Sequence, residues 1–141
     1  MVKISIGCDH GGISLKAEIV PLLEQLGHTV DDKGCFSTES VDYPDFAKAV
    51  CTQVQTGGSE RGILICGTGV GMSMVANRFE GIRAALGNEL FTARMSREHN
   101  DANVLCLGAR VVGPGLAVEI VREWVSTEFA GGRHQRRIDM F

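Results

Sequence analysis

The chain has 141 residues, of which 44% are hydrophobic and 22% are charged, with a net charge of -3. This length and composition are typical of one domain that buries its own core, so we expect a single domain over residues 1–141. The balanced charge gives no reason to expect a nucleic-acid or membrane partner. No apolar run approaches the roughly 20 residues of a membrane span, and no signal-peptide pattern follows Met1. We therefore expect a cytoplasmic protein.

Strand-like and helix-like segments alternate along the whole chain. Short apolar runs rich in β-branched residues predict strands at 2–8, 29–31, 61–66, 82–86 and 103–107. Apolar residues at helical spacing predict helices at 13–26, 43–55, 89–98 and 114–129, and residues 72–78 can start another. Such alternation favours an α/β fold, in which a five-stranded parallel sheet is covered by helices on both faces.

The segment 63–71 (ILICGTGVG) joins a predicted buried strand to a glycine-rich turn and a helix start. Its three glycines allow backbone conformations closed to other residues, and the N–H groups there would gather at a positive helix end. Because a helix N-terminus stabilises a thiolate, Cys66 is a candidate nucleophile or general base. Thr68 lies within reach of the sulfur or of a substrate oxygen. The alternative is a core cysteine before an ordinary strand–helix turn.

Several cofactors are disfavoured by spacing. The glycines follow the third predicted strand as G-x-G-x-G, whereas the dinucleotide fingerprint is G-x-G-x-x-G after a first strand, and no lysine completes a P-loop. NAD and ATP are therefore not expected. The cysteines contain no C-x-x-C pair, which indicates neither a zinc site nor disulfides, so we expect Cys8, Cys51 and Cys106 to be small core residues. We expect no metal and no cofactor.

Polar side chains gather at three further places. Asp9 and His10 follow the first strand, where they could bind hydroxyls or tune a proton transfer, although Asp9 could instead cap the first helix. His99 and Asn100 end a helix, so His99 is either a general acid or a cation at a helix terminus. The segment 131–141 begins with two glycines and RHQRR, which is either a solvated terminus or a clamp for a phosphate or carboxylate.

This inventory predicts a cofactor-free proton transfer next to a carbonyl. A thiol base would act beside backbone N–H groups that stabilise an enediolate, as an oxyanion hole does. Two alternatives remain open on the residues alone. One is a non-catalytic module that binds a sugar phosphate or nucleotide, and the other is a hydrolase or transferase with Cys66 as nucleophile.

Six motifs in order resemble those of type B ribose-5-phosphate isomerases: GCDHG at 7–11, DYP at 42–44, CGTGVG at 66–71, HNDANV at 99–104, GARVVG at 108–113 and GGRHQ at 131–135. The resemblance covers residues 2–139. It implies a Rossmann-like three-layer αβα sandwich that interconverts D-ribose 5-phosphate and D-ribulose 5-phosphate through an enediolate, without metal or organic cofactor. It also implies a homodimer, or a dimer of dimers, whose active sites take residues from both chains.

The resemblance also implies roles for individual residues. Cys66 matches the base that moves a proton between C1 and C2, Thr68 the residue that assists it at the sugar hydroxyls, and His99 the group that opens the furanose ring. The anion hole for the enediolate is matched by the backbone of Gly67, Thr68, Gly69, Val70 and Gly71. Other substrate contacts are matched by Asp9, His10, Tyr43 and Asn100, and the phosphate site by Arg110, Arg133 and Arg137, with His134 nearby.

Sugar length is the open question within this resemblance. Galactose-6-phosphate isomerase, which shares the fold, pairs two different subunits that each lack part of the motif set. This chain holds both the cysteine motif and the His-Asn pair with its GGRH tail, which favours the self-sufficient ribose enzyme. A six-carbon substrate, allose 6-phosphate or galactose 6-phosphate, is the alternative, because one extra hydroxymethylene requires only a longer pocket.

Overall fold

The computed structural model describes all 141 residues. One five-stranded parallel sheet has the order β2-β1-β3-β5-β4. Its strands are β1 (Lys3–Cys8), β2 (Thr29–Asp32), β3 (Arg61–Cys66), β4 (Ala84–Leu86) and β5 (Val104–Gly108). The helices are α1 (Ile13–Gln25), α2 (Tyr43–Gln55), α3 (Val70–Ala76), α4 (Leu90–Glu98), α5 (Pro114–Ser126) and α6 (Arg133–Ile138), and a short 3-10 turn, η1 (His10–Gly12), precedes α1. None of these helices combines the length and the apolar character that a membrane-spanning helix needs.

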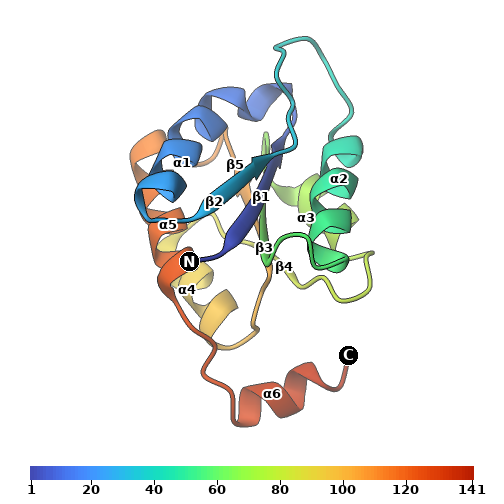
Figure 1. Cartoon of the computed structure of the whole chain (residues 1–141), viewed down its shortest axis with the longest axis vertical. Helices are drawn as coiled ribbons and strands as arrows, with labels where there is room; N and C mark the ends of the chain where they lie inside the picture. The colour runs from blue at the N-terminus through green and yellow to red at the C-terminus, as the bar shows by residue number, and fades with distance from the viewer.

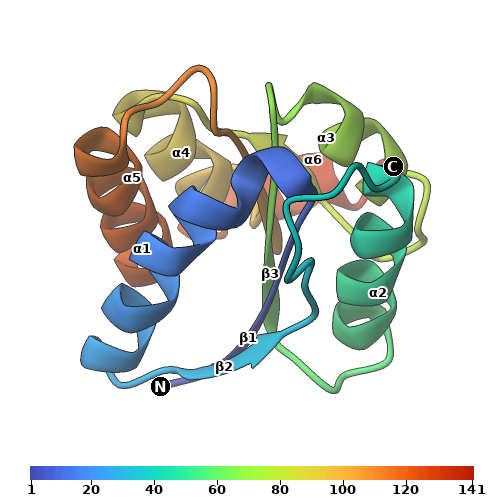
Figure 2. The same cartoon turned by 90° about the horizontal axis from the view of Figure 1, so that it is seen from above.

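Helices cover both faces of the sheet, as predicted (Figures 1 and 2). Figure 2 shows α1, α4 and α5 against one face and α2 and α3 against the other. Successive residues of β3 alternate between the two cores, with Ile63 and Ile65 packed toward the first group of helices and Leu64 and Cys66 toward the second. Burial on both faces explains why the strand is apolar throughout. The predicted α/β sandwich is confirmed.

Two glycines let α2 approach the sheet closely. A Cβ atom on Gly62 of β3 would lie 2.6 Å from Val50 Cγ1, and one on Gly7 of β1 would lie 2.9 Å from Val50 Cγ2. Both distances are below ordinary van der Waals contact, and the side chain of a β-branched residue in a helix has little rotamer freedom to move away. The position of α2, which carries Tyr43 at its first residue, therefore depends on these glycines.

The structure differs from the prediction at several boundaries. The third helix begins at Val70, two residues before the predicted start, and β4 begins at Ala84 rather than at residue 82. The basic segment RHQRRI forms a helix, α6, that was not predicted, after a turn at Gly131 and Gly132, both with positive φ. Only Ile138 of α6 is buried, so the segment lacks the apolar spacing that would have predicted a helix.

Replacement of Gly62 with alanine should lower the free energy of unfolding by about 1–3 kcal/mol, because the added methyl group overpacks the contact with α2. Urea unfolding followed by circular dichroism measures this loss. The matched control is Gly115→Ala in α5, where an added Cβ meets nothing within 4 Å. That variant should be as stable as the unmodified chain or more stable, because alanine favours a helix over glycine. Equal stability of both variants would contradict the packing argument.

Candidate functional site

Three strand ends meet at the carboxyl edge of the sheet. The N–H of Asp9, just after β1, donates to the Ile65 carbonyl of β3 at 3.1 Å. The N–H of Ala109, just after β5, donates to the Cys66 carbonyl at 2.8 Å. The loops after β1, β3 and β5 therefore lie side by side, where open α/β sheets place their ligands. β1 and β3 are neighbours in the sheet and pair in parallel.

The Cys66 sulfur lies inside the glycine loop. It is 6% exposed, and the N–H of Gly69 donates to Sγ at 3.2 Å. The Thr68 hydroxyl accepts the N–H of Val70, the first residue of α3, at 3.2 Å. A backbone donor thus faces the atom that would carry charge as a thiolate, at the start of a helix. Thr68 does not bond the sulfur in this arrangement, but its hydroxyl hydrogen is free to donate to a ligand.

The glycines of this loop serve different purposes from those expected. Gly69 has the left-handed φ of 81° that glycine favours, whereas Gly67 and Gly71 do not have positive φ values. At Gly71 the requirement is space, because a Cβ there would lie 2.6 Å from the ring of Tyr43. Tyr43 is therefore held against the first turn of α3, next to the loop.

Asp9 and His10 directly follow β1 and lie at the same carboxyl edge of the sheet. Asp9 Oδ1 accepts the N–H of Gly11 at 2.9 Å, so Asp9 caps the short 3-10 turn η1. It does not cap the first helix α1, as considered from the sequence, because the N-cap residue of α1 is Gly12. His10 Nδ1 accepts the N–H of Val41 at 3.2 Å, which leaves the proton of a neutral imidazole on Nε2. His10 is exposed, so this Nε2–H can donate to a ligand.

Three other cysteines lie in the core. Cys8, Cys51 and Cys106 are fully buried, as predicted, and burial raises the pKa of both Cys8 and Cys51 to about 12. Burial likewise raises the pKa of Cys106, with Cys51 and Cys66 adding to the effect. These three thiols stay protonated at neutral pH. No group of three or more His, Cys, Asp or Glu side chains is placed to hold a metal ion.

Asn88 is a site residue that the sequence analysis missed. Its Nδ2 donates to the Thr68 carbonyl at 3.2 Å, and its Oδ1 accepts the N–H of Gly108 at 2.8 Å. It thereby joins the glycine loop to the end of β5 and to the following residues, which lead to Arg110. The backbone N–H of Arg110 in turn donates to the Gly67 carbonyl at 3.0 Å. A single asparagine in a β–α loop has no pattern from which this bridge could be inferred.

The remaining predicted residues lie elsewhere. His99 is the residue after α4, and its ring stacks on His134 of α6 with centroids 4.2 Å apart and an interplanar angle of 12°. Partial burial, followed by the charges of His99, Arg133 and Arg137, lowers the pKa of His134. The lowered pKa favours the neutral form of the His134 imidazole.

The predicted site residues fall into two groups, one with Cys66 and one with His99, at opposite edges of the sheet. The N–H of Gly62, near the start of β3, donates to the carbonyl of Asn103, which closely follows His99. Cys66 is four residues further along β3, about 13 Å at the strand rise of about 3.3 Å per residue. Figure 1 shows α6 beyond the end of the sheet that lies opposite the strand arrowheads. One chain therefore does not bring Cys66 and His99 together.

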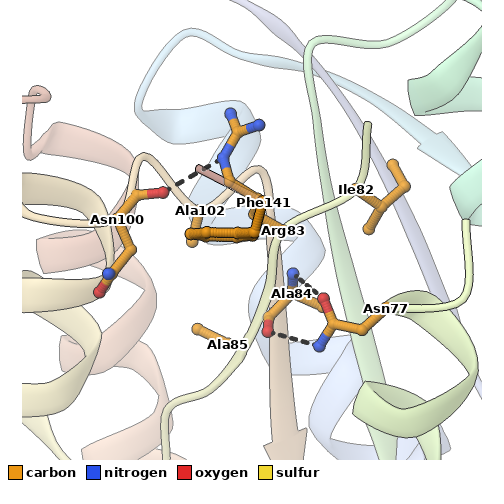
Figure 3. A pocket seen from close by; sticks show the side chains of 8 residues that line it. All are labelled: Asn77, Ile82, Arg83, Ala84, Ala85, Asn100, Ala102 and Phe141. Atoms are coloured by element: carbon orange, nitrogen blue, oxygen red, sulfur yellow. Dashed lines mark hydrogen bonds between the residues drawn. The ribbon is translucent and has the colours of Figure 1, made fainter. Parts of the chain in front are cut away.

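The carboxyl-edge group consists of Asp9, His10, Tyr43, Cys66 to Gly71 and Arg110. The amino-edge group consists of His99, Asn100, Arg133, His134 and Arg137. The largest cleft of the chain, about 460 Å³, is shown in Figure 3 and includes one residue of the amino-edge group, Asn100. It is lined by Asn77, Ile82, Arg83, Ala84, Ala85, Asn100, Ala102 and Phe141. Cys66 lines none of the five clefts of the single chain.

Replacement of Asn88 with alanine should destabilise the chain by about 1–3 kcal/mol, because it leaves the N–H of Gly108 and the carbonyl of Thr68 without partners. Asn88→Asp keeps the acceptor for Gly108 and loses only the donor to Thr68, so its loss should be smaller. Chemical denaturation of the three proteins measures the order. A stability of Asn88→Ala equal to that of the unmodified chain would show that the bridge does not hold the loop.

The sequence of this chain matches a family model and several curated proteins. A family model described as Ribose/Galactose Isomerase matches residues 4–141. Ribose-5-phosphate isomerase B of Escherichia coli is 52% identical over 139 residues, which cover 99% of this chain and 93% of that protein. D-erythrulose-4-phosphate isomerase of Pectobacterium atrosepticum is 44% identical over 140 residues, 99% of this chain and 92% of that protein.

A solved structure gives the same result in three dimensions. Clostridium thermocellum ribose-5-phosphate isomerase B matches with a TM-score of 0.96 and 54% identity, covering 98% of this chain and 93% of that chain. The family expected from the six motifs is thus confirmed along nearly the whole length. The chain belongs to the ribose/galactose isomerase family and is an isomerase.

Proposed function

We propose that this isomerase interconverts D-ribose 5-phosphate and D-ribulose 5-phosphate through an enediolate. The observation that carries the proposal is the Cys66 sulfur, which accepts the Gly69 N–H at 3.2 Å within a loop at the carboxyl edge. A base held by a backbone donor suits a reaction that needs only proton movement. The E. coli and C. thermocellum relatives, which are named for ribose 5-phosphate, support this substrate.

The chemistry requires one base and a site for negative charge. Cys66, as the thiolate, takes the C2 proton of the open-chain aldose while the carbonyl oxygen on C1 gains a proton, which gives the enediol. Return of a proton to C1 and loss of the O2 proton then complete the ketose. In this scheme the Thr68 hydroxyl forms hydrogen bonds with the sugar oxygens on C1 and C2, and the backbone of residues 67–71 stabilises the enediolate.

Ring opening requires a second group, for which we propose His99 of a partner subunit. Ribose 5-phosphate is mainly a furanose, so an acid–base group must first open the ring. His99 lies at the amino edge, whereas Cys66 lies at the carboxyl edge, and a homodimer that places these edges against each other completes the site. Such a dimer would add Asn100 from the partner to the contacts made by Asp9, His10 and Tyr43. A dimer of dimers repeats the same site.

The phosphate site would be divided in the same way. Arg110 lies with Cys66, while Arg133 and Arg137 lie on α6 with His134. Guanidinium groups bind phosphate in a forked geometry, which suits a dianion placed between the two subunits. The glycine loop then serves the reacting end of the sugar, and the arginines hold its far end. The cytoplasmic location expected from the sequence stays a prediction.

A four-carbon sugar phosphate is the second candidate substrate. The relative from P. atrosepticum, named for D-erythrulose 4-phosphate, is 44% identical over nearly the same length. The six-carbon phosphates considered from the sequence form the third group. The four-, five- and six-carbon substrates share the chemistry at C1 and C2 and differ in the distance from there to the phosphate.

Conversion of ribose 5-phosphate tests the proposed function directly. In deuterated water with a chelator, proton NMR should show ribulose 5-phosphate appearing as the C2 proton signal of ribose 5-phosphate disappears. Cys66→Ala should lower kcat by about a thousandfold or more, because the base is lost, while sugar-phosphate binding is retained. Cys51→Ala, which changes a buried thiol outside the site, should retain activity.

Turnover by Cys66→Ala at the unmodified rate would contradict the role of Cys66. If the unmodified protein converts erythrose 4-phosphate or allose 6-phosphate but not ribose 5-phosphate, the reaction class stands and the sugar is corrected. Binding of all these sugars without exchange of the proton would instead favour a binding module.

Mixing two inactive variants tests the shared site. Cys66→Ala and His99→Asn should each be inactive alone on ribose 5-phosphate. After unfolding and refolding together at equal concentration, half of the dimers are mixed, and each mixed dimer has one intact site and one doubly altered site. About a quarter of the unmodified activity should return, since symmetric dimers build each site from both chains. No recovery, with mixed dimers detected by native mass spectrometry, would place both residues in one chain's site.

A further inference from the structure

Asp101 is the only residue other than glycine with a positive φ, which is 46°. Side chains of L-residues are strained in this left-handed region, although aspartate tolerates it better than most, and such strain persists only where the surroundings hold it. Asp101 directly follows His99 and Asn100 in the turn between α4 and β5. A constrained backbone therefore adjoins the two residues that the proposed function places against the substrate.

Two arginines hold the Asp101 side chain, one at each oxygen. Arg97 Nη1 donates to Oδ1 at 2.9 Å, and Arg83 Nη2 donates to Oδ2 at 3.3 Å. Arg97 is only 5% exposed, so its charge is largely removed from water and the aspartate is its carboxylate partner. Charge-assisted bonds of this kind fix geometry as well as adding stability.

The same guanidinium groups also bind the backbone of the turn. Arg83 Nε donates to the carbonyls of Asn100 at 3.2 Å and of Asp101 at 3.0 Å, and Figure 3 shows the first of these bonds. Arg97 Nη1 donates to the Ala102 carbonyl at 2.7 Å. Three consecutive carbonyls are thus held by two side chains that meet at one carboxylate. The turn after His99 has little freedom while the carboxylate is present.

Arg97 also reaches the segment that leads to α6. Its Nε donates to the carbonyl of Thr127, just after α5, at 3.2 Å. Close by, the N–H of Ala130 donates to the carbonyl of Glu98 at 3.0 Å. The end of α4 and the approach to His134 are therefore tied at one place. The stack of the two histidine rings depends on both segments.

We propose that Asp101 is a positioning residue for ring opening, which acts by holding His99 through its bonds to Arg83 and Arg97. The inference rests on the proposed function, in which His99 opens the furanose ring. Asp101 would not touch the substrate. Removal of its carboxylate would loosen the turn, and a small displacement of an acid–base group is costly for rate. The carboxyl edge with Cys66 would be unaffected, because it lies at the other end of the sheet.

The test compares a reaction that needs ring opening with one that does not. D-ribulose 5-phosphate has no free hydroxyl on C5 and therefore cannot close a furanose ring on C2. Exchange of its C1 proton with deuterated water requires Cys66 but no ring opening. In Asp101→Gly, which removes the carboxylate and keeps a residue suited to positive φ, kcat on ribose 5-phosphate should fall about tenfold or more, while this exchange should change less than about twofold.

Matched variants separate positioning from folding. Glu119→Gln removes a carboxylate from an exposed pair on α5, Glu119 and Arg122, and should match the unmodified enzyme in both reactions. Arg83→Lys keeps the charge but loses the Nε–H that binds the carbonyls of Asn100 and Asp101, and should show the same split as Asp101→Gly. If Asp101→Gly does not fold, as judged by circular dichroism, Arg83→Lys carries the test.

Two results would overturn the inference. One is an unmodified rate on ribose 5-phosphate in these variants, and the other is an equal loss in both reactions, which indicates a structural role only. Failure of the unmodified enzyme in both reactions would contradict the proposed function instead, so the two failures are distinguishable.

Discussion

Parallel pairing of β1, β3 and β5 brings the residues after each strand to one edge, where backbone hydrogen bonds join Asp9 to Ile65 and Ala109 to Cys66. Strands β1, β3 and β5 are packed against helices on both faces of the sheet, so their ends cannot shift independently of one another. Because the glycine loop directly follows β3, its position relative to the sheet is also fixed. Its donor to the Cys66 sulfur is positioned by the sheet rather than by contacts within the loop alone.

The same pairing has a second consequence. In a parallel sheet every connecting helix must return the chain to the amino edge, so residues at helix ends and residues at strand ends are separated by the length of a strand. His99 ends a helix and Cys66 ends a strand. Their separation follows from the topology, and no loop movement within one chain removes it. A second subunit is the simplest way to bring the two edges together.

The order and type of the elements could be predicted because the strands are apolar on both faces and the helices α2, α4 and α5 have clear periodicity. Helix α6 could not, since Ile138 alone among its residues is buried. Asn88 could not be found either, because its bonds join segments 20 residues apart. Gly71 was identified for its backbone freedom, yet the structure requires it for contact with the Tyr43 ring. Local patterns give elements and motifs, whereas contacts between distant segments decide what each residue does.

The division of polar residues between two edges also bears on how such enzymes diversify. In a dimer built as proposed, each chain supplies one edge to one site and the other edge to the second site. After a gene duplication, one copy could lose the residues of the carboxyl-edge group and the other copy those of the amino-edge group. A dimer of the two different copies would still hold one complete site. An obligate heteromer could therefore arise by loss alone, without any new contact. In a dimer built as proposed, the sheet topology would leave that route open, whereas a site contained within one chain would close it.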